Sequence, residues 1–260
     1  MLEKYKDLYK LDGKVAFVAG GGGGIGSAIS EGLASLGATV ILSDMTDEGA
    51  AKIADGINKA GGKAEGYALN VTDIASIEPF MKKTADSHGS VDILVNCVGT
   101  HKEEDAEKYT ETDWDRIFSI NLKAAFFLSQ GVAKQQIGKG GGAHMHLTSV
   151  RSLLGIHRGY ISYCASKGGM VMMIKQLATE WAKHKITVNG IAPTFTNTPL
   201  VANYLNDPDF LNPLLERIPL GRVCEPIDIA GLAMFLASPA GSFVTGQNIV
   251  IDGGMTMRIG

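Results

Sequence analysis

Short hydrophobic runs alternate with longer amphipathic stretches along the whole chain. The runs predict strands buried on both faces, and the stretches predict helices because their apolar residues recur at helical spacing. The expected strands are 14–19, 39–43, 64–69, 91–95, 144–148, 186–191 and 248–251, and the expected helices are about 25–36, 47–60, 73–87, 112–137, 160–183 and 226–237. This alternation predicts an α/β fold of the Rossmann type, a doubly wound parallel sheet with helices on both faces.

No linker-like segment or internal repeat divides the chain, which predicts a single domain over residues 1–260. The segment at about 195–219 departs from the strand and helix pattern, because Asn, Asp and Pro residues interrupt an amphipathic stretch that contains Tyr204 and Phe210. Such a composition predicts a mobile lid over a substrate site. The alternative is a peripheral helical excursion that packs on its own domain.

Composition and charge narrow the classes of partner. The 260 residues carry 24 Lys and Arg against 27 Asp and Glu, a net charge of -3, so no broad positive field attracts nucleic acid or anionic lipid. The first ten residues resemble no signal peptide, no apolar run is long enough to cross a membrane, and the three cysteines are too widely spaced for a disulfide framework. We therefore expect a cytoplasmic protein with a small-molecule partner and no metal, nucleic-acid or membrane partner.

Glycine is in excess, at 33 of 260 residues, and an unbroken glycine run at Gly20–Gly24 follows the first expected strand. A strand, a glycine-rich turn and a helix predict a site for a dinucleotide pyrophosphate, because bare backbone approaches phosphate closely and a helix N-terminus favours an anion. We assign Gly20 to the turn, Gly24 to the pyrophosphate approach and Gly26 to helix packing. We expect Gly21–Gly23 to matter mainly because they supply no basic side chain. A flexible loop of the same composition is the alternative.

Asp44 ends the second expected strand, about 20 residues after the glycine run begins, where an acidic residue accepts hydrogen bonds from an adenosine ribose. A carboxylate at this place also repels the 2′-phosphate of NADP. The glycine run adds no positive charge that would offset the repulsion. The expected cofactor is therefore NAD rather than NADP.

Tyr163 and Lys167 lie four positions apart in an expected helix and so share one face. A free phenol has a pKa of about 10 and is a poor proton carrier at neutral pH. Because a neighbouring ammonium stabilises the phenolate, we expect Lys167 to lower the pKa of Tyr163, which then acts as general acid in ketone reduction and general base in alcohol oxidation. Ser149, at the carboxyl end of a strand, is expected to polarise or orient the substrate oxygen.

The spacing Gly20-x-x-x-Gly24-x-Gly26 together with Tyr163-x-x-x-Lys167 resembles the short-chain dehydrogenase/reductase family, over almost the whole chain. Further motifs of the family follow in order at the expected strand ends: Asn70-Val-Thr-Asp73, Asn96-Cys-Val-Gly99, Asn121, Ser149 and Pro193-Thr-Phe-Thr-Asn-Thr198. Within the family, the chain resembles the gluconate and deoxygluconate dehydrogenases and the 3-oxoacyl-carrier-protein reductases. The resemblance implies an oxidoreductase that interconverts a secondary alcohol and a ketone by hydride transfer to or from a nicotinamide cofactor.

The resemblance also implies roles for individual residues. The implied catalytic residues are Asn121, Ser149, Tyr163 and Lys167, with Asn121 holding a water that links Lys167 to solvent and Lys167 also binding the nicotinamide ribose. The expected cofactor-binding residues are Gly20, Gly23, Gly24, Ile25, Gly26, Asp44, Asn70, Val71, Asn96, Gly99, Tyr163, Lys167, Pro193, Thr196 and Thr198. Asn70 departs from the aspartate common in the family, and its carbonyl is expected to accept a hydrogen bond from the adenine amino group.

Basic residues are frequent in the segments expected to surround the substrate pocket: His101, Lys102, Arg151, His157 and Arg158. A cationic rim predicts an anionic or polyhydroxylated substrate, such as a sugar acid or a polyol. Solvated loop residues explain the same pattern, and this alternative stays open. The expected substrate-binding residues are Ser149, Arg151, His157, Tyr163 and Tyr204.

Two other functions remain as alternatives. The 3-oxoacyl-carrier-protein reductases of the family mostly use NADP, and Asp44 argues against that activity. Some relatives keep the dinucleotide-binding fold but act as redox-sensing regulators of a different functional class. A regulator has no need of the implied proton relay, so the presence of Asn121, Ser149, Tyr163 and Lys167 together favours an enzyme.

His144 and His146 alternate along one face of an expected strand. A pair of this kind suggests a metal site, but no carboxylate or thiolate lies nearby at ligand spacing. We therefore interpret both histidines as packing residues or as partners for buried polar groups.

Oligomeric state is implied only by the resemblance. Relatives form tetramers through the long helix around Asn121, the helix after Tyr163 and the C-terminal strand. The apolar residues Met255, Met257 and Ile259 provide such a surface near the C-terminus, so a homotetramer is expected.

Overall fold

The computed structural model describes residues 2–257 and contains one seven-stranded sheet. The strands are β1 (Val15–Ala19), β2 (Thr39–Asp44), β3 (Lys63–Ala68), β4 (Ile93–Asn96), β5 (Gly142–Leu147), β6 (Ile186–Pro193) and β7 (Asn248–Ile251). They lie in the order β3-β2-β1-β4-β5-β6-β7, and every neighbouring pair is parallel. Each expected strand is confirmed, with its bounds shifted by a residue or two at most.

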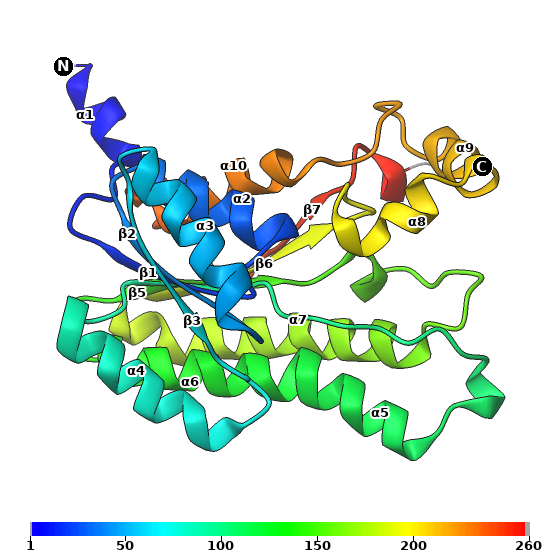
Figure 1. The fold of residues 1–260 in the computed structure, drawn as a ribbon, viewed down its shortest axis with the longest axis horizontal. Helices are drawn as coiled ribbons and strands as arrows, with labels where there is room; N and C mark the ends of the chain where they lie inside the picture. The colour runs from blue at the N-terminus through cyan, green and yellow to red at the C-terminus, as the bar shows by residue number, and fades with distance from the viewer. Residues whose placement is uncertain (1, 258–260) are drawn as a thin grey trace.

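Helices cover both faces of the sheet (Figure 1). One face carries α2 (Gly24–Ser35), α3 (Asp47–Lys59) and α10 (Pro226–Ala237), and the other carries α4 (Ile74–His88), α5 (Glu111–Phe118), α6 (Ala124–Gln136) and α7 (Ile161–Trp181). The expected doubly wound α/β fold of the Rossmann type is therefore confirmed. Within residues 2–257, no helix combines the length and the apolar character that a membrane crossing requires.

The central strand β1 shows why the buried strands are continuous apolar runs in the sequence. Every residue of β1 is buried, and successive side chains point to opposite faces of the sheet. Ala16 and Val18 belong to the apolar cluster that α2 and α10 complete, whereas Phe17 packs with Met81 of α4 and Leu128 of α6 in the cluster on the other face. Because both faces are covered, a polar residue at either face of β1 would lie in a core.

The strand order reverses direction between β1 and β4. The chain proceeds from β1 to β2 on one side and later returns to β4 on the other side of β1. Ligands of doubly wound folds bind in the crevice outside the carboxyl ends of the strands at such a reversal. A ligand-binding site is therefore expected at the loops that follow β1 and β4.

The long helix expected over 112–137 is interrupted. It consists of α5, a π-helical turn at Ser119–Lys123, and α6. Asn121 lies within the turn, and its side chain makes hydrogen bonds to both backbone polar groups of Thr100 in the loop after β4. Apolar periodicity does not reveal an inserted residue of this kind, whereas π-turns are frequent at functional sites.

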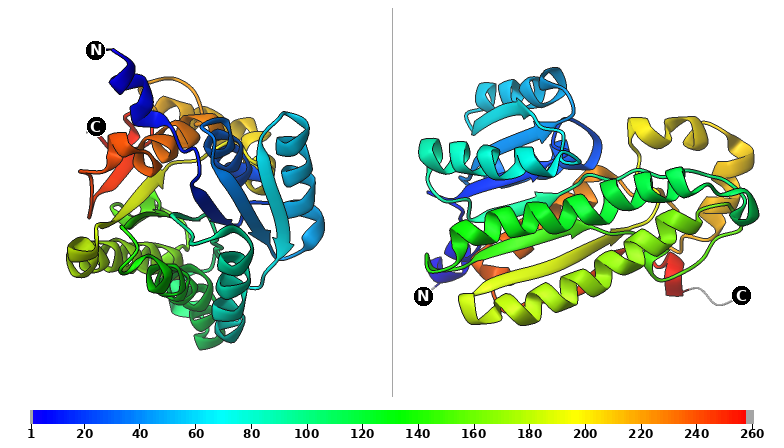
Figure 2. Two further views of the ribbon diagram at one scale, coloured as in Figure 1. Left: turned by 90° about the vertical axis from the view of Figure 1, so that its left-hand side faces the viewer. Right: turned by 90° about the horizontal axis from the view of Figure 1, so that it is seen from below.

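The segment expected as a lid contains two helices, α8 (Ala202–Leu205) and α9 (Pro208–Glu216). Helix α9 begins at Pro208, and the Asp207 carboxylate accepts a hydrogen bond of 3.0 Å from the backbone N–H of Asp209. Both helices lie at the opposite end of the molecule from the N-terminus, as the yellow and gold ribbons in Figure 2 show. A short helix, α1 (Glu3–Lys6), precedes the first strand and was not expected from the sequence.

His144 and His146 on β5 are fully buried and pair with polar side chains of α6. The His144 Nε2 atom lies 2.9 Å from Gln136 Oε1, and the His146 Nε2 atom lies 3.0 Å from Ser129 Oγ. The interpretation of both histidines as partners of buried polar groups is confirmed. Within the described residues, no group of three His, Cys, Asp or Glu side chains is arranged to hold a metal ion.

These two histidines are expected to make the fold sensitive to acid. Burial lowers the pKa of each histidine to about 3, below the ordinary value of 6.5. Between these two pH values the unfolded chain therefore binds protons that the native chain does not bind. Their stabilising contribution is complete above pH 6.5 and is lost as the pH falls towards 3. We expect each histidine to account for about 2 kcal/mol of lost unfolding free energy between pH 7 and pH 5.

Urea unfolding of the wild-type protein and of His146→Gln at both pH values measures this effect. The variant is expected to lose about 2 kcal/mol less than the wild type over the same pH interval. Equal losses in the two proteins would contradict the assignment of the acid sensitivity to the buried imidazoles.

Candidate active site

The glycine run forms a tight loop between β1 and α2. Gly20 has a φ of 77° and Gly24 has a φ of 54°, conformations that favour glycine. The backbone N–H groups of Gly20 and Gly21 both donate to the carbonyl oxygen of Ser43 on β2. A Cβ atom at Gly26 would overlap the carbonyl oxygen of Gly20, so the start of α2 packs directly on the loop. The expected turn at Gly20 and close packing at Gly26 agree with this geometry.

Asp44 braces the glycine loop from the end of β2. One oxygen of its carboxylate accepts a hydrogen bond of 3.0 Å from the backbone N–H of Gly22, and the other accepts one of 2.7 Å from Met45. A Cβ atom at Gly22 would lie 2.6 Å from the Asp44 carboxylate, whereas a Cβ atom at Gly23 would meet nothing within 4 Å. The expectation that Gly21–Gly23 matter mainly for lacking a basic side chain is therefore wrong for Gly22, which must be bare to accommodate Asp44.

The turn after β3 carries Asn70 and Val71. The Asn70 side-chain oxygen accepts hydrogen bonds from the backbone N–H of Thr72, at 3.1 Å, and from its hydroxyl, at 2.7 Å. The Asn70 side chain therefore shapes its own turn, an arrangement typical of asparagine. Val71 is buried in the core beneath β1.

These features test whether a nicotinamide dinucleotide fits at the reversal between β1 and β4. The loop offers backbone without side chains and the first turn of a 12-residue helix, α2, and it lies beside the Asp44 carboxylate. Such a cradle suits a pyrophosphate, and an acidic neighbour suits a ribose. The residues present fit the cofactor.

Asn96 ends β4, and Gly99 lies in the loop that follows. Asn96 is buried, and its side-chain oxygen accepts a hydrogen bond of 3.1 Å from the backbone N–H of Val98, which holds the loop in place. A Cβ atom at Gly99 would lie 3.3 Å from the Lys167 ammonium. Gly99 therefore leaves the space beside this ammonium open.

Tyr163 and Lys167 lie one turn apart near the start of α7, as expected. The Lys167 Nζ atom is 5.8 Å from the centroid of the Tyr163 ring and donates a hydrogen bond of 2.6 Å to the carbonyl oxygen of Leu147 at the end of β5. Lys167 is only 3% exposed, and burial lowers its pKa to about 8. The ammonium is therefore held in the wall of the site by one backbone carbonyl.

Ser149 follows β5 and lies close enough to Tyr163 for its side chain to lower the pKa of that phenol. The Ser149 hydroxyl oxygen accepts a hydrogen bond of 3.1 Å from the backbone N–H of Arg151, which fixes the side chain in place. The expectation that Lys167 lowers the pKa of Tyr163 is wrong in this structure. Burial raises the pKa of Tyr163, and the neighbouring Ser149 side chain and the positive charge of Arg151 only partly oppose the effect of burial.

Asn121 ties the loop after β4 to α7. Its side-chain oxygen accepts a hydrogen bond of 2.8 Å from the backbone N–H of Thr100, and its amide group donates to the Thr100 carbonyl at 2.9 Å and to the Ser166 hydroxyl at 3.0 Å. Asn121 is fully buried. It therefore fixes the position of Gly99 relative to Lys167.

A cavity of about 200 Å³ opens at the carboxyl ends of β4, β5 and β6. The expected site residues that line it are Ile25, Gly99, Ser149, Arg151, Tyr163, Lys167, Pro193, Thr196, Thr198 and Tyr204. His157, an expected substrate-binding residue, does not line it. His157 is exposed, in the loop that leads from Ser149 to α7. The prediction for His157 is wrong in this structure.

The cavity has an aromatic wall that was not predicted from the sequence. Tyr160 and Phe195 line it, and the centroid of the Tyr160 ring lies 6.0 Å from that of Tyr163 and 5.2 Å from that of His101. Tyr160 stands three positions before Tyr163, so helical spacing was a usable signal for it. Burial lowers the pKa of His101, so this ring contributes to the wall as a neutral aromatic group at pH 7.

The expected cationic rim is reduced to one residue at the cavity wall. Lys102 is paired with Asp113 at 2.6 Å, and Arg158 is paired with Glu103 at 2.7 Å. Arg151 lines the cavity, is 8% exposed and donates a hydrogen bond of 3.0 Å to the carbonyl of Gly155. No carboxylate within residues 2–257 forms an ion pair with Arg151.

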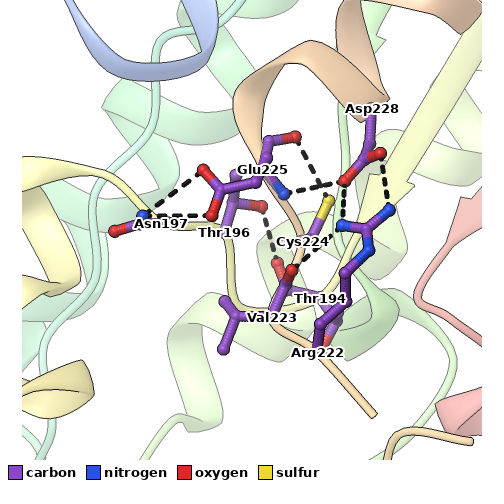
Figure 3. Close-up of polar contacts among 8 residues, drawn as sticks. All are labelled: Thr194, Thr196, Asn197, Arg222, Val223, Cys224, Glu225 and Asp228. Carbon is purple, nitrogen blue, oxygen red and sulfur yellow. Dashed lines mark hydrogen bonds and ion pairs between the residues drawn. The ribbon is translucent and has the colours of Figure 1, made fainter. Parts of the chain in front are cut away.

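A polar network fixes the loop after β6, which carries Thr196 and Thr198 (Figure 3). Thr196 and Cys224 form a parallel bridge, and the Asn197 side chain donates to the Glu225 carboxylate at 3.1 Å. Arg222 donates two hydrogen bonds to Asp228, at 2.6 and 2.8 Å, which hold the chain at the start of α10. The two ends of the α8–α9 segment are therefore fastened together beside the cavity.

Comparison with known proteins agrees with this geometry. A family model described as "Enoyl-(Acyl carrier protein) reductase" matches residues 20–256. A D-threitol dehydrogenase of Mycolicibacterium smegmatis is 38% identical over 96% of this chain and 95% of its own length. A 3-oxoacyl-[acyl-carrier-protein] reductase of Thermotoga maritima is 36% identical over 95% of this chain and 100% of its own length.

Solved structures agree as well. The crystal structure of a gluconate 5-dehydrogenase from Burkholderia cenocepacia, in complex with NADP and tartrate, superposes with a TM-score of 0.93. It is 33% identical in sequence, and the match covers 97% of this chain and 99% of that chain. The sequence and the fold therefore both match these proteins over nearly the full length of the chain. The glycine loop and the placement of Tyr163 and Lys167 agree with these matches. The chain belongs to the short-chain dehydrogenase/reductase family of oxidoreductases.

Proposed function

We propose that the protein interconverts a secondary alcohol and a ketone with Tyr163 as the general acid and base. The observation that carries the proposal is a cavity that Ser149, Tyr163 and Lys167 line together, with the Lys167 Nζ atom 5.8 Å from the centroid of the Tyr163 ring. A nicotinamide cofactor, when bound, supplies or accepts the hydride. The Tyr163 hydroxyl donates a proton to the carbonyl oxygen in reduction and takes it back in oxidation, while Ser149 orients that oxygen.

Lys167 and Asn121 complete the proposed proton relay. Burial lowers the pKa of Lys167 to about 8, so its ammonium is still mostly charged at neutral pH and adds a positive charge to the cavity wall. Asn121 positions the loop beside this ammonium through its three hydrogen bonds. Proton exchange with solvent by way of Lys167 and a water held near Asn121, as the family resemblance implies, is part of the proposal.

We propose NAD as the preferred cofactor. The residues that would hold it are Gly20, Gly23, Gly24, Ile25, Gly26, Asp44, Asn70, Val71, Asn96, Gly99, Tyr163, Lys167, Pro193, Thr196 and Thr198. Asp44 supports the preference, because its carboxylate lies 3.0 Å from the backbone nitrogen of Gly22 and would repel a 2′-phosphate at this place. The Burkholderia cenocepacia relative was crystallised with NADP, so the preference needs a direct test on this chain.

We propose a sugar acid as the substrate, with Arg151 as the group that binds its carboxylate. Arg151 lines the cavity and forms no ion pair within the described residues, and a planar guanidinium matches a carboxylate with two parallel hydrogen bonds. Ser149, Tyr163 and Tyr204 are the other proposed substrate contacts. A polyol is the second candidate substrate, which the similarity to a D-threitol dehydrogenase favours.

Replacing Arg151 separates these two substrates. Arg151→Gln is expected to lower kcat/KM for gluconate by about 100-fold, because the carboxylate loses its counter-charge in a partly desolvated cavity. The same variant is expected to change kcat/KM for D-threitol by less than about threefold. Steady-state NADH formation measures kcat/KM for both substrates. Because D-threitol is uncharged, a loss of activity with it would reveal distortion of the loop at Gly155. Equal losses for the two substrates would contradict the role of Arg151.

Two alternative functions are a thioester reductase and a non-catalytic sensor of dinucleotides. The similarity to a 3-oxoacyl-[acyl-carrier-protein] reductase favours a thioester substrate, while Asp44 weighs against the NADP that such enzymes mostly use. A non-catalytic sensor of dinucleotides would bind NADH without turnover. Ser149, Tyr163 and Lys167 line one open cavity, which supports an enzyme over a sensor.

We propose that the protein is a cytoplasmic homotetramer with a single domain. Trp114 of α5 and Met172 of α7 are exposed apolar side chains on the helices that the family resemblance assigns to the subunit contact. Met257 is exposed too, and Ile259 lies outside the described residues. Cys97, Cys164 and Cys224 are free thiols, which supports a reducing compartment. Light scattering on the purified protein measures the assembly directly.

A further inference from the structure

One arginine joins the α8–α9 segment to the opposite wall of the cavity. Arg158 lies in the loop between Ser149 and Tyr163, and its guanidinium carbon is 4.9 Å from the centroid of the Tyr204 ring in α8 and 5.4 Å from that of Phe210 in α9. The same carbon is 5.6 Å from the ring of Tyr160, beside the start of α7. These distances lie within the range of attraction between a cation and an aromatic face.

Glu103 holds this guanidinium in place. The Arg158 Nε and Nη2 atoms donate to the two carboxylate oxygens of Glu103, at 2.9 and 2.7 Å, in a bidentate pair. A bidentate pair occupies one edge of the planar group and leaves its faces available for aromatic rings. Arg158 thereby connects three loops: the loop after β4, the loop before α7, and the segment after β6.

The rings around Arg158 continue into the cavity wall. The Phe210 centroid is 5.1 Å from that of Phe195 and 5.4 Å from that of Tyr204. Tyr160, Phe195 and Tyr204 line the cavity, whereas Arg158 and Glu103 do not. A change in the position of Arg158 is therefore transmitted to residues that face the substrate, without direct contact between Arg158 and the substrate.

The base of the α8–α9 segment is fastened separately, through the Thr196 and Cys224 bridge and the pair of Asn197 with Glu225. We propose that Arg158 and Glu103 form a clasp that holds α8 and α9 closed over the cavity. They are positioning residues. Opening requires the rings of Tyr204 and Phe210 to leave the guanidinium, while the fastened base acts as the hinge.

Hydrogen exchange tests the clasp in the full-length protein without ligands. In Arg158→Met, which keeps an apolar side chain of similar length, the backbone amides of α8 and α9 are expected to exchange about tenfold faster than in the wild type. Arg158→Lys keeps the charge but loses the bidentate plane, and a smaller increase is expected. Lys102→Met is the matched control. Lys102 lies beside Glu103 in the loop after β4, but it is paired with Asp113 of α5 and contacts the ring of Tyr109, outside the α8–α9 segment.

Unchanged exchange in α8 and α9 of a folded Arg158→Met protein would overturn the clasp, as would an equal increase in Lys102→Met. If Arg158→Met fails to fold, Glu103→Gln replaces it, and about a threefold increase confined to α8 and α9 is expected. These readouts need no turnover. They therefore remain valid even if the proposed oxidoreductase function of the cavity fails.

The consequence for turnover rests on the proposed function. With gluconate and NAD, Arg158→Met is expected to raise KM by about tenfold and to leave kcat unchanged or higher, because an open segment binds substrate weakly and releases product quickly. Arg158→Lys is expected to restore KM partly. A fall in kcat with unchanged KM would contradict a positioning role and indicate damage to the reacting groups.

Discussion

Tyr163→Phe is expected to lower kcat/KM by about a thousandfold while NADH binding changes by less than about threefold. The substitution removes one hydroxyl and leaves the ring, so the 5.8 Å approach of the Lys167 ammonium to that ring is retained. What is lost is the hydroxyl that exchanges a proton with the substrate oxygen beside Ser149 in the cavity wall. Steady-state kinetics and fluorescence titration with NADH measure the two quantities.

Tyr160→Phe is the matched control for this experiment. Its ring also lines the cavity and lies 6.0 Å from that of Tyr163, so the same atom is removed from a neighbouring position. We expect kcat/KM to stay within about threefold of the wild type. If Tyr163→Phe lost no more activity than Tyr160→Phe, the assignment of the general acid to Tyr163 would be wrong.

A second large effect is expected from a double substitution in the cofactor loop. Asp44→Ala with Gly23→Arg is expected to shift the ratio of kcat/KM for NADH to that for NADPH by about 100- to 1,000-fold towards NADPH. The change removes a carboxylate that repels a 2′-phosphate and adds a guanidinium that binds one. Gly23 accepts the new side chain because a Cβ atom there meets nothing within 4 Å and its backbone is extended.

Gly22→Ala serves as the contrasting substitution. A Cβ atom at Gly22 would lie 2.6 Å from the Asp44 carboxylate, so this variant is expected to weaken binding of NADH and of NADPH alike, with no gain in preference for NADPH. Kinetics with both cofactors on all three proteins separate loop distortion from charge recognition. A wild-type preference for NADPH would refute the role given to Asp44.

The sheet was predictable because its strands are covered on both faces. Each residue of β1 lies in a core, so an apolar run was the only pattern compatible with that position. The interruption at Ser119–Lys123 was not predictable, because a π-turn keeps the helical pattern on either side and is stabilised by Asn121 bonding to the distant Thr100. Helix α9 was expected only as part of a lid, since Pro208 and Pro213 interrupt its helical signal.

Part of the candidate site was likewise predictable from the sequence, and part was not. The glycine loop, Asp44, Tyr163 and Lys167 were predictable because spacing along the chain places them at strand ends or on one helix face. The electrostatics were not predictable, because they depend on tertiary neighbours. Arg158 and Lys102 looked like free cations in the sequence, but Glu103 and Asp113 neutralise them. Burial likewise reversed the expected direction of the Tyr163 pKa shift.

The most direct test of the proposed function uses the purified wild-type protein with NAD and gluconate, 2-deoxygluconate or D-threitol, and measures the formation of NADH. A 3-oxoacyl thioester is tested in the reverse direction, with the oxidation of NADH as the readout. We expect NADH formation with a sugar acid at a kcat/KM above that for D-threitol, and little NADH oxidation with the thioester. Turnover of the thioester alone, or tight binding of NADH without turnover of any of these compounds, would contradict the proposed function.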